Sequence, residues 1–341
     1  MVVDPQGSRQ RGAAVVATGA WAHHHDTGST VALVIGGVAR MTLSSRDEQG
    51  RTLTLAREPQ RIVSLVPSDT YNLFALGAGE RVVGRTDYCV EPAAALRCPS
   101  VGGTKNVDVA HVLALKPDLV VANREENRRL DIERLLAAGA PVLLSLPTTV
   151  MAGITHCERL LSLLPSLAAT AADTLARARE KCTRLATVQA PAVDTFVPIW
   201  MDPLMTVAAD TFISDVVALV GGRNVFANRP RRYPLGADLG RREALPAEAI
   251  EGRDTRYPRV TLDEVVARRP ELVLLPDEPH TFTLRDAAVF EALDIPAAGG
   301  GIHLCAGRAL MWYGLAAIAG LDSLAALLKQ ARQRRGGAAI R

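Results

Sequence analysis

This sequence of 341 residues has few aromatic side chains, little net charge and no long apolar stretch. Aromatic residues make up 4% of the chain, which leaves little material for stacking nucleic-acid bases. The formal net charge is only +3, so the charge balance also argues against a dedicated nucleic-acid binder. No stretch approaches the roughly 18 consecutive apolar residues of a membrane-spanning helix, so no membrane insertion is expected.

The five cysteines form no CxxC pair, and their odd number argues against a disulfide framework. A reducing compartment is the simpler expectation, although Cys89 and Cys98 are close enough in sequence to pair in an exported protein. The apolar run 31–39 resembles the core of a secretory signal, but only two arginines and a run of histidines precede it. We therefore expect a cytoplasmic protein, with a periplasmic or exported protein as the alternative.

The chain contains none of the motifs GxxxxGK[ST], HExxH and GxSxG, and no EF-hand loop. Its histidines outside the N-terminal run are scattered, whereas a transition-metal site needs three or four converging ligands. His280 beside Asp277 and Glu278 is the one suggestive cluster, and a polar loop at a ligand cleft explains it equally well. We predict no catalytic residue, no metal ligand and no required cofactor, so the protein is expected to be a binder and not an enzyme.

The hydrophobic pattern predicts an α/β protein with two lobes. Residues 1–40 show no sustained period and are expected to form a disordered extension. Apolar strands alternate with amphipathic helices over 41–165 and again over 191–335, which predicts one parallel-sheet lobe in each range. Residues 166–190 are rich in Ala, Leu and Arg, and the pattern predicts a single long helix that joins the lobes.

An internal similarity supports two related halves. Aligning Pro117 with Pro270, an offset of 153 residues, matches the segment 112–121 to 265–274. Both segments show a helical stretch, a basic residue, Pro, an acid and an apolar strand, although helix–Pro–strand is also a common connector in α/β proteins. The alignment places residues 123–126 and 276–279 just past the carboxyl ends of two strands, where open parallel sheets bind ligands.

Several ordered motifs resemble one known family. They lie at 61–68, 73–77, 82–89, 101–106, 115–120 and 122–127 in the first half, and at 199–203, 205–207, 221–226, 256–258, 275–279 and 312–314 in the second. Over roughly residues 45–330 the chain resembles the periplasmic binding proteins with a helical backbone (cluster A, or class III), which serve importers of cobalamin, haem and ferric siderophores. It is most similar to the cobalamin-binding-protein-like branch, the helical backbone metal receptors.

The resemblance implies two Rossmann-like α/β lobes joined by a single long helix, with a cobalamin-like or other metal-chelate ligand between them. Such ligands are held mainly by aromatic walls and a few polar groups. Ordinary core packing is the competing interpretation for each aromatic residue, and a solvated loop is the competing interpretation for residues 124–126. The candidate ligand-binding residues are the aromatic Tyr88, Trp200, Phe282, Trp312 and Tyr313, and the polar Asp87, Lys105, Asn123, Arg124, Asp202, Asp277 and Glu278.

The chain departs from the family pattern in two places. Importer-linked relatives present one glutamate per lobe to a permease, and the matching positions here are Ala110 and Ala218, which puts docking on an ABC permease in doubt. An Arg- and Glu-rich insertion at 229–253, which repeats an Arg-Tyr-Pro element, is expected to be a solvated loop that could cover one edge of the cleft.

These observations favour a soluble chelate binder that acts in sequestration, delivery or sensing. An exported component of an ABC importer is the first alternative. An enzyme is the second, because related two-lobed folds also hold redox metalloclusters.

Overall fold

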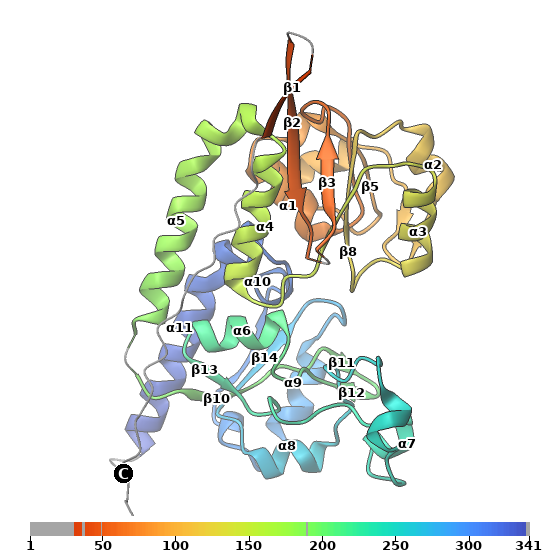
Figure 1. Cartoon of the computed structure of the whole chain (residues 1–341). Helices are drawn as coiled ribbons and strands as arrows, with labels where there is room; N and C mark the ends of the chain where they lie inside the picture. The colour runs from red at the N-terminus through yellow and green to blue at the C-terminus, as the bar shows by residue number, and fades with distance from the viewer. Residues whose placement is uncertain (1–30, 36–37, 49, 189, 339–341) are drawn as a thin grey trace, which may run out of the picture.

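In a computed structural model of the chain, which describes residues 31–35, 38–48, 50–188 and 190–338, two α/β lobes lie one above the other (Figure 1). Each lobe is built on a four-stranded parallel sheet. The predicted fold class, two α/β lobes joined by a long helix, is therefore confirmed. No helix in the described part of the chain is both long and apolar enough to cross a membrane.

The sheet of the N-terminal lobe has the strand order β5-β4-β8-β9. Its central strand β8 is buried at every position, as expected for an apolar run covered by helices on both faces. The elements of this lobe are β4 (Ile62–Ser64), α1 (Pro67–Ala75), β5 (Val82–Arg85), β6 (Gly102–Gly103), β7 (Asn106–Val107), α2 (Val109–Ala114), β8 (Leu119–Asn123), α3 (Arg129–Ala137), β9 (Val142–Ser145) and α4 (Val150–Ser162).

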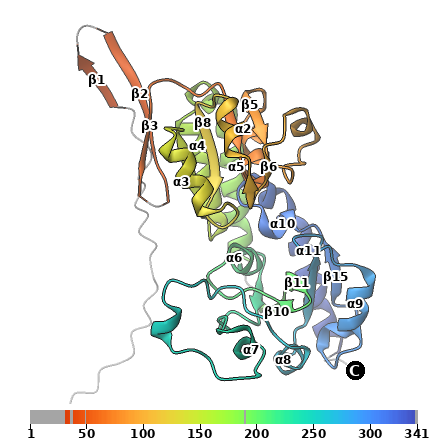
Figure 2. The same ribbon diagram turned by 90° about the vertical axis from the view of Figure 1, so that its right-hand side faces the viewer.

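An antiparallel ribbon precedes this sheet. Strand β1 (Val31–Ile35) pairs with β2 (Val38–Arg46), which pairs in turn with β3 (Thr52–Leu55). Strands β2 and β3 thus form a hairpin around residue 50. Residues 1–40 were expected to be a disordered extension, and the structure draws 31–35 and 38–40 within it as strand (Figure 2). Residues 1–30 lie outside the described residues.

The C-terminal lobe repeats the architecture with the strand order β13-β10-β14-β15. A short antiparallel hairpin, β11–β12, follows β10 in the chain. The elements of this lobe are β10 (Val193–Phe196), β11 (Trp200–Met201), β12 (Leu204–Met205), α6 (Phe212–Leu219), β13 (Gly222–Asn224), α7 (Leu235–Asp238), α8 (Leu262–Arg268), β14 (Leu272–Pro276), α9 (Leu284–Glu291), β15 (Ile302–Cys305), α10 (Arg308–Met311) and α11 (Leu315–Ala338).

The two halves match in backbone detail as well as in strand order. Strands β8 and β14, which the internal alignment equates, occupy the same position in their sheets. Lys116 and Arg269, the residues before the aligned prolines, both have a φ of 50°. They are the only non-glycine residues in the described ranges with a positive φ. Because this conformation is rare outside glycine, its recurrence at the aligned positions indicates a true internal repeat.

Two long helices run along one flank of both lobes. Helix α5 (Ala168–Ala186) joins the lobes, and α11 lies beside it and also packs against α1 and α4 (Figure 1). One continuous apolar cluster extends across the junction and includes Ile62, Leu175, Leu272 and Leu328. The lobes therefore share a hydrophobic core along this flank, which limits their motion relative to each other.

A buried polar network fastens the same junction. The hydroxyl of Tyr313, at the turn between α10 and α11, donates to Asp69 Oδ2 at 2.8 Å and lies 2.8 Å from Ser145 Oγ. His156 Nε2 lies 2.7 Å from the other oxygen of Asp69. Burial and the neighbouring Asp69 raise the pKa of Tyr313 well above its usual value, so the phenol stays protonated and keeps its donor.

The turn that carries Tyr313 is held by Asn72 of α1. Its amide donates to the carbonyl of Tyr313 at 3.2 Å and accepts from the N–H of Leu315 at 2.9 Å, which caps the start of α11. Gly314 between them has a φ of 81°, and a Cβ there would lie 2.5 Å from Asn72 Oδ1. Only glycine therefore fits this close approach.

We predict that Tyr313→Phe lowers the free energy of unfolding by about 1–3 kcal/mol, because Asp69 loses a donor inside the core. Urea unfolding measures the change, and Tyr88→Phe, at a tyrosine that is 62% exposed, serves as the matched control with no expected effect. Equal stability of the two variants would show that the junction does not depend on this hydroxyl.

Candidate ligand-binding cleft

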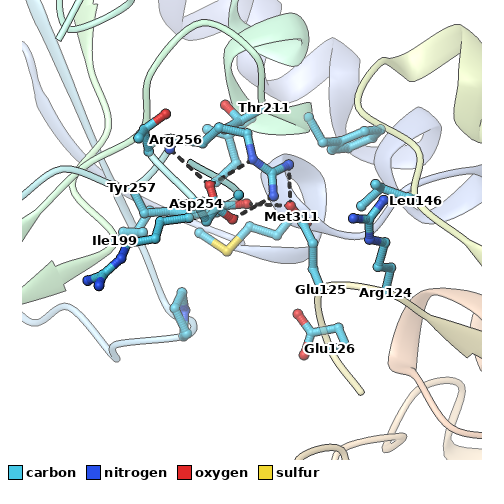
Figure 3. Close-up of a pocket in the computed structure, with 16 residues that line it drawn as sticks. Arg124, Glu125, Glu126, Leu146, Ile199, Thr211, Asp254, Arg256, Tyr257 and Met311 are labelled. Carbon is cyan, nitrogen blue, oxygen red and sulfur yellow. Dashed lines mark hydrogen bonds and ion pairs between the residues drawn. The ribbon is translucent and has the colours of Figure 1, made fainter. Parts of the chain in front are cut away.

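A cavity of about 800 Å³ lies between the two lobes. The N-terminal lobe contributes residues after the carboxyl ends of β8 and β9, where ligands bind in open parallel sheets. The C-terminal lobe contributes the loops after β10 and β14, the start of α6, the loop before α8 and the last residue of α10. The lining residues are Arg124, Glu125, Glu126, Leu146, Ile199, Thr211, Phe212, Ile213, Gly252, Arg253, Asp254, Thr255, Arg256, Tyr257, Pro279 and Met311 (Figure 3).

The loop 124–126 is positioned by Asn123 at the end of β8. The side-chain oxygen of Asn123 accepts from the backbone N–H groups of Glu125 at 2.8 Å and Glu126 at 3.2 Å. Its amide donates to Ser145 Oγ at 3.2 Å, and Lys105 Nζ donates to the carbonyl of Glu125. Asn123 is itself buried, so its role in this structure is to hold the loop.

The insertion at 229–253 reaches the opposite side of the cleft. Its base is organised by a buried ion pair, in which Arg229 Nη1 lies 2.9 Å from Asp238 Oδ1. Asp238 also accepts from the backbone N–H groups of Arg232 at 2.9 Å and Arg259 at 2.7 Å. Residues 241–249 are exposed, as expected for a solvated loop. Gly252 and Arg253 line the cavity, so the insertion covers one edge of it.

An ion-pair group spans the cleft from one lobe to the other. Glu125 Oε1 lies 2.5 Å from Arg256 Nη1 and accepts from the hydroxyl of Tyr257 at 3.0 Å. Arg256 is also held by Asp254, with Nε–Oδ1 at 3.0 Å and Nη2–Oδ2 at 2.6 Å. We call Glu125, Asp254, Arg256 and Tyr257 the cleft clasp (Figure 3). Burial and the Glu125 carboxylate raise the pKa of Tyr257, so its hydroxyl remains a donor.

The inner part of the cavity is apolar and belongs to the lobe junction. Phe212 and Ile213 open α6, whose N-terminus is capped by Thr211, with Ser214 N donating to its hydroxyl at 3.3 Å. Asp215 of the same helix accepts from the N–H of Val150 at 2.7 Å, which caps α4 of the other lobe. Met311, Leu146 and Ile199 complete this surface. The arrangement offers an apolar floor with charged groups at the rim, as in sites for cofactor-sized ligands.

Glu278 stands beside the cleft with an unusual carboxyl group. Its Oε1 is buried without a hydrogen-bond partner. Burial first, and then the negative charges of Asp277 and Glu126, raise its pKa to about 7, against the opposing effects of Trp312 and Arg308. The Glu126 carboxyl, although it keeps contact with solvent, also has a raised pKa, because the surrounding protein desolvates it and Glu125 is close.

Of the twelve predicted ligand-binding residues, the structure places only Arg124 in the cavity lining. Phe282, Trp312 and Tyr313 are buried, as the core-packing interpretation expects, and Trp312 packs edge-on against Tyr71. Trp200 is 42% exposed and lies edge-on to His280, with its indole N–H donating to the carbonyl of Asp202. The exposed Asp87 and Asp277 accept from Ser100 Oγ and from the backbone N–H of Gly307.

Sequence reasoning missed most of the cavity lining. Arg256 and Tyr257 appear in the sequence analysis only within the family motif 256–258, not as candidate binding residues. The repeated Arg-Tyr-Pro element was the sequence signal that could have identified them. Leu146, Ile199 and Met311 carry no signal in one sequence, because an apolar residue after a strand or helix is expected in any core.

No group of three His, Cys, Asp or Glu side chains in the described ranges could hold a metal ion. His280 lies 3.9 Å from Asp286 and between the rings of Trp200 and Phe282, so it does not converge with other metal-ligating side chains. All five cysteines are free, and Cys89 and Cys98 are not paired.

The sequence model of a family described as "Periplasmic binding protein" matches residues 62–260, which is more than half of the chain. A vitamin B12-binding protein of Yersinia pestis is 29% identical over 226 residues, which cover 65% of this chain and 72% of that protein. The periplasmic vitamin B12 binding protein BtuF of Vibrio cholerae has a similar structure, with a TM-score of 0.64 and 21% identity over 81% of this chain and 98% of that one. A periplasmic haem-binding protein of Pseudomonas aeruginosa gives a TM-score of 0.61 and 22% identity over 79% and 92% of the two chains.

These findings correct the expected location. The prediction of a cytoplasmic protein is wrong, because the matched family and the similar solved structures are periplasmic binding proteins. The odd number of cysteines did not indicate a reducing compartment, because free thiols that are buried away from oxidants also persist in an oxidising one. Cys89, Cys157 and Cys182 are buried, and burial raises the pKa of each thiol, which disfavours the reactive thiolate.

We predict that Glu278→Gln changes how stability depends on pH. Between pH 4.5 and about 7 the folded protein retains the proton of Glu278 that the unfolded chain has released, so this group lowers the free energy of unfolding as the pH rises. The variant should therefore gain on the order of 1–2 kcal/mol relative to the unmodified protein across this window. Urea unfolding at several pH values measures this difference in the free energy of unfolding. For the control Glu248→Gln, at an exposed glutamate, the difference from the unmodified protein should not change with pH.

Proposed function

Because this chain belongs to the periplasmic binding protein family, whose members carry ligands and are not enzymes, we propose that it binds a cobalamin-like or other metal-chelate ligand in the cleft between its lobes. The observation that carries the proposal is the cavity of about 800 Å³ to which both lobes contribute. Its volume lies within the range of about 300–1,000 Å³ typical of sites for cofactors and other small molecules.

Two further features support a chelate of this size. The carboxyl ends of both parallel sheets face the cavity, so the ligand would meet the loops of both halves of the repeat. The relatives in Yersinia and Vibrio are named for vitamin B12, and other structures with this fold are named for haem. The shared core and the Tyr313 network keep the lobes in one arrangement, so the cleft is formed before the ligand arrives.

We predict that cyanocobalamin, haem or a ferric siderophore binds with micromolar or tighter affinity in isothermal titration. Leu146→Ala should weaken the binding about 5- to 30-fold, because it removes roughly 1–2 kcal/mol of apolar contact with the ligand. Leu284→Ala is the matched control, since Leu284 is 77% exposed and is not a lining residue. Absence of heat and of any thermal shift with all three ligands would rule out this ligand class.

We propose further that the chain does not dock on an ABC permease through a pair of glutamates. Ala110 on α2 and Ala218 on α6 are both exposed, as docking positions must be, but neither can form an ion pair. Exposed alanines also place no steric barrier there. The electrostatic registration that paired glutamates would supply to a permease is therefore missing at these positions.

Proteoliposomes that contain a vitamin B12 permease from a relative test this point. We expect the chain to stimulate the permease ATPase at least about tenfold less than the relative's own binding protein, and the double variant Ala110→Glu/Ala218→Glu to recover part of the stimulation. Equal stimulation by the unmodified chain would contradict the proposal. The single variant Ala249→Glu, on an exposed surface of the insertion, controls for added charge.

A further inference from the structure

The cleft clasp is built like a recognition site for a carboxylate. Two donors, the Arg256 guanidinium and the Tyr257 hydroxyl, converge on a single oxygen, Oε1 of Glu125, at 2.5 and 3.0 Å. A guanidinium and a phenol that share one acceptor oxygen form charge-assisted bonds of defined direction. At present a carboxylate of the protein itself fills this position.

The Arg256 donor is fixed independently of Glu125. Asp254, two residues before Arg256, holds the guanidinium through two hydrogen bonds, at 3.0 and 2.6 Å, and leaves Nη1 to face the cleft. The Arg256 backbone N–H also bonds Asp254, at 3.0 Å. Arg256 would therefore keep its orientation if Glu125 moved away.

Glu125 can leave without disturbing its loop. The backbone of the loop is held by Asn123 and Lys105 and not by the Glu125 carboxylate. The side chains of Glu125 and Arg256 are 31% and 23% exposed, so the ion pair is open to a competing solute. A rotation of one side chain is enough to free the two donors.

The rest of the lining holds two arginines and one acid. Arg124 and Arg253 both line the cavity, and neither has a carboxylate partner among the residues that the structure describes. The Arg253 guanidinium lies 5.1 Å from the ring centre of Tyr233. Arg124 lies on the other lobe, in the loop after β8 (Figure 3). The remaining acid of the lining is Glu126, so the two arginines outnumber it.

We propose that Glu125 is a place-holder, and that the ligand of this cleft carries a carboxylate that takes the place of Glu125 on Arg256 and Tyr257. This inference rests on the proposed function, since it concerns the same cleft, and it selects among chelates those with acidic side groups. The displaced Glu125 turns toward Arg124 and solvent, so the exchange keeps every charge paired or hydrated.

Comparing haem with its dimethyl ester distinguishes the contribution of the carboxylates to binding from that of the ring, because the two ligands differ only in their two acidic groups. We expect Glu125→Gln to bind haem about 5- to 10-fold more tightly than the unmodified chain, since the internal competitor has lost its charge. The ester should bind both proteins within about twofold. Arg256→Gln should weaken haem binding at least about tenfold and leave the ester unchanged.

Glu133→Gln is the matched control, because Glu133 forms an exposed ion pair with Arg129 on α3, outside the cleft. Weaker or unchanged haem binding by Glu125→Gln would overturn the inference, as would an equal effect on haem and its ester. In that case the clasp would serve only to hold the lobes together.

Cyanocobalamin, whose ring carries amides in place of carboxylates, distinguishes failure of the inference from failure of the proposed function. Binding of cyanocobalamin or of the ester without haem would overturn the inference alone. Absence of binding by every chelate, with intact folding by circular dichroism, would overturn both.

Discussion

The Tyr313 hydroxyl, buried between Asp69 and Ser145, sets the relation between the lobes. The hydrogen bonds of this hydroxyl join three parts of the chain: the first helix of the N-terminal lobe, the last strand of that lobe's sheet and the turn before the final helix. A polar group in this position must be fully paired, so only one arrangement of those elements satisfies it. Together with the apolar cluster along α5 and α11, this network makes the cleft a pre-formed space between lobes of fixed relative position.

The chemistry of the cleft follows from that rigidity. Because the junction already holds the lobes together, the charged clasp at the rim is not needed to close the cleft, and its ion pair is available for exchange. The insertion contributes to this arrangement because the buried Arg229–Asp238 pair anchors its base, which brings Arg253, Asp254 and Arg256 to the rim. An apolar floor and an exchangeable ionic rim suit a ligand that is apolar in its body and charged at its edge.

The internal repeat shows how far one sequence can predict a structure. The alignment of Pro117 with Pro270 placed residues 123–126 and 276–279 at matching strand ends, and in the structure both loops meet the cleft, through Arg124 to Glu126 and through Pro279. The aromatic residues were harder to interpret, because the same side chain can line a ligand cleft or pack in the hydrophobic core. Phe282 and Tyr313 proved to be buried, whereas Trp200 is partly exposed.

By itself, the sequence determined the class of protein: alternating apolar strands and helices, a long helix without Gly or Pro and repeated strand-end loops require two α/β lobes with a cleft between them. These features are periodic or local, so they can be recognised in a single sequence. Only the tertiary structure decided which side chains line the cleft. Glu125 and Arg256 are separated by more than a hundred residues and meet because two lobes are packed together. Such a contact depends on the relative position of both lobes, and no spacing within one strand or helix records it.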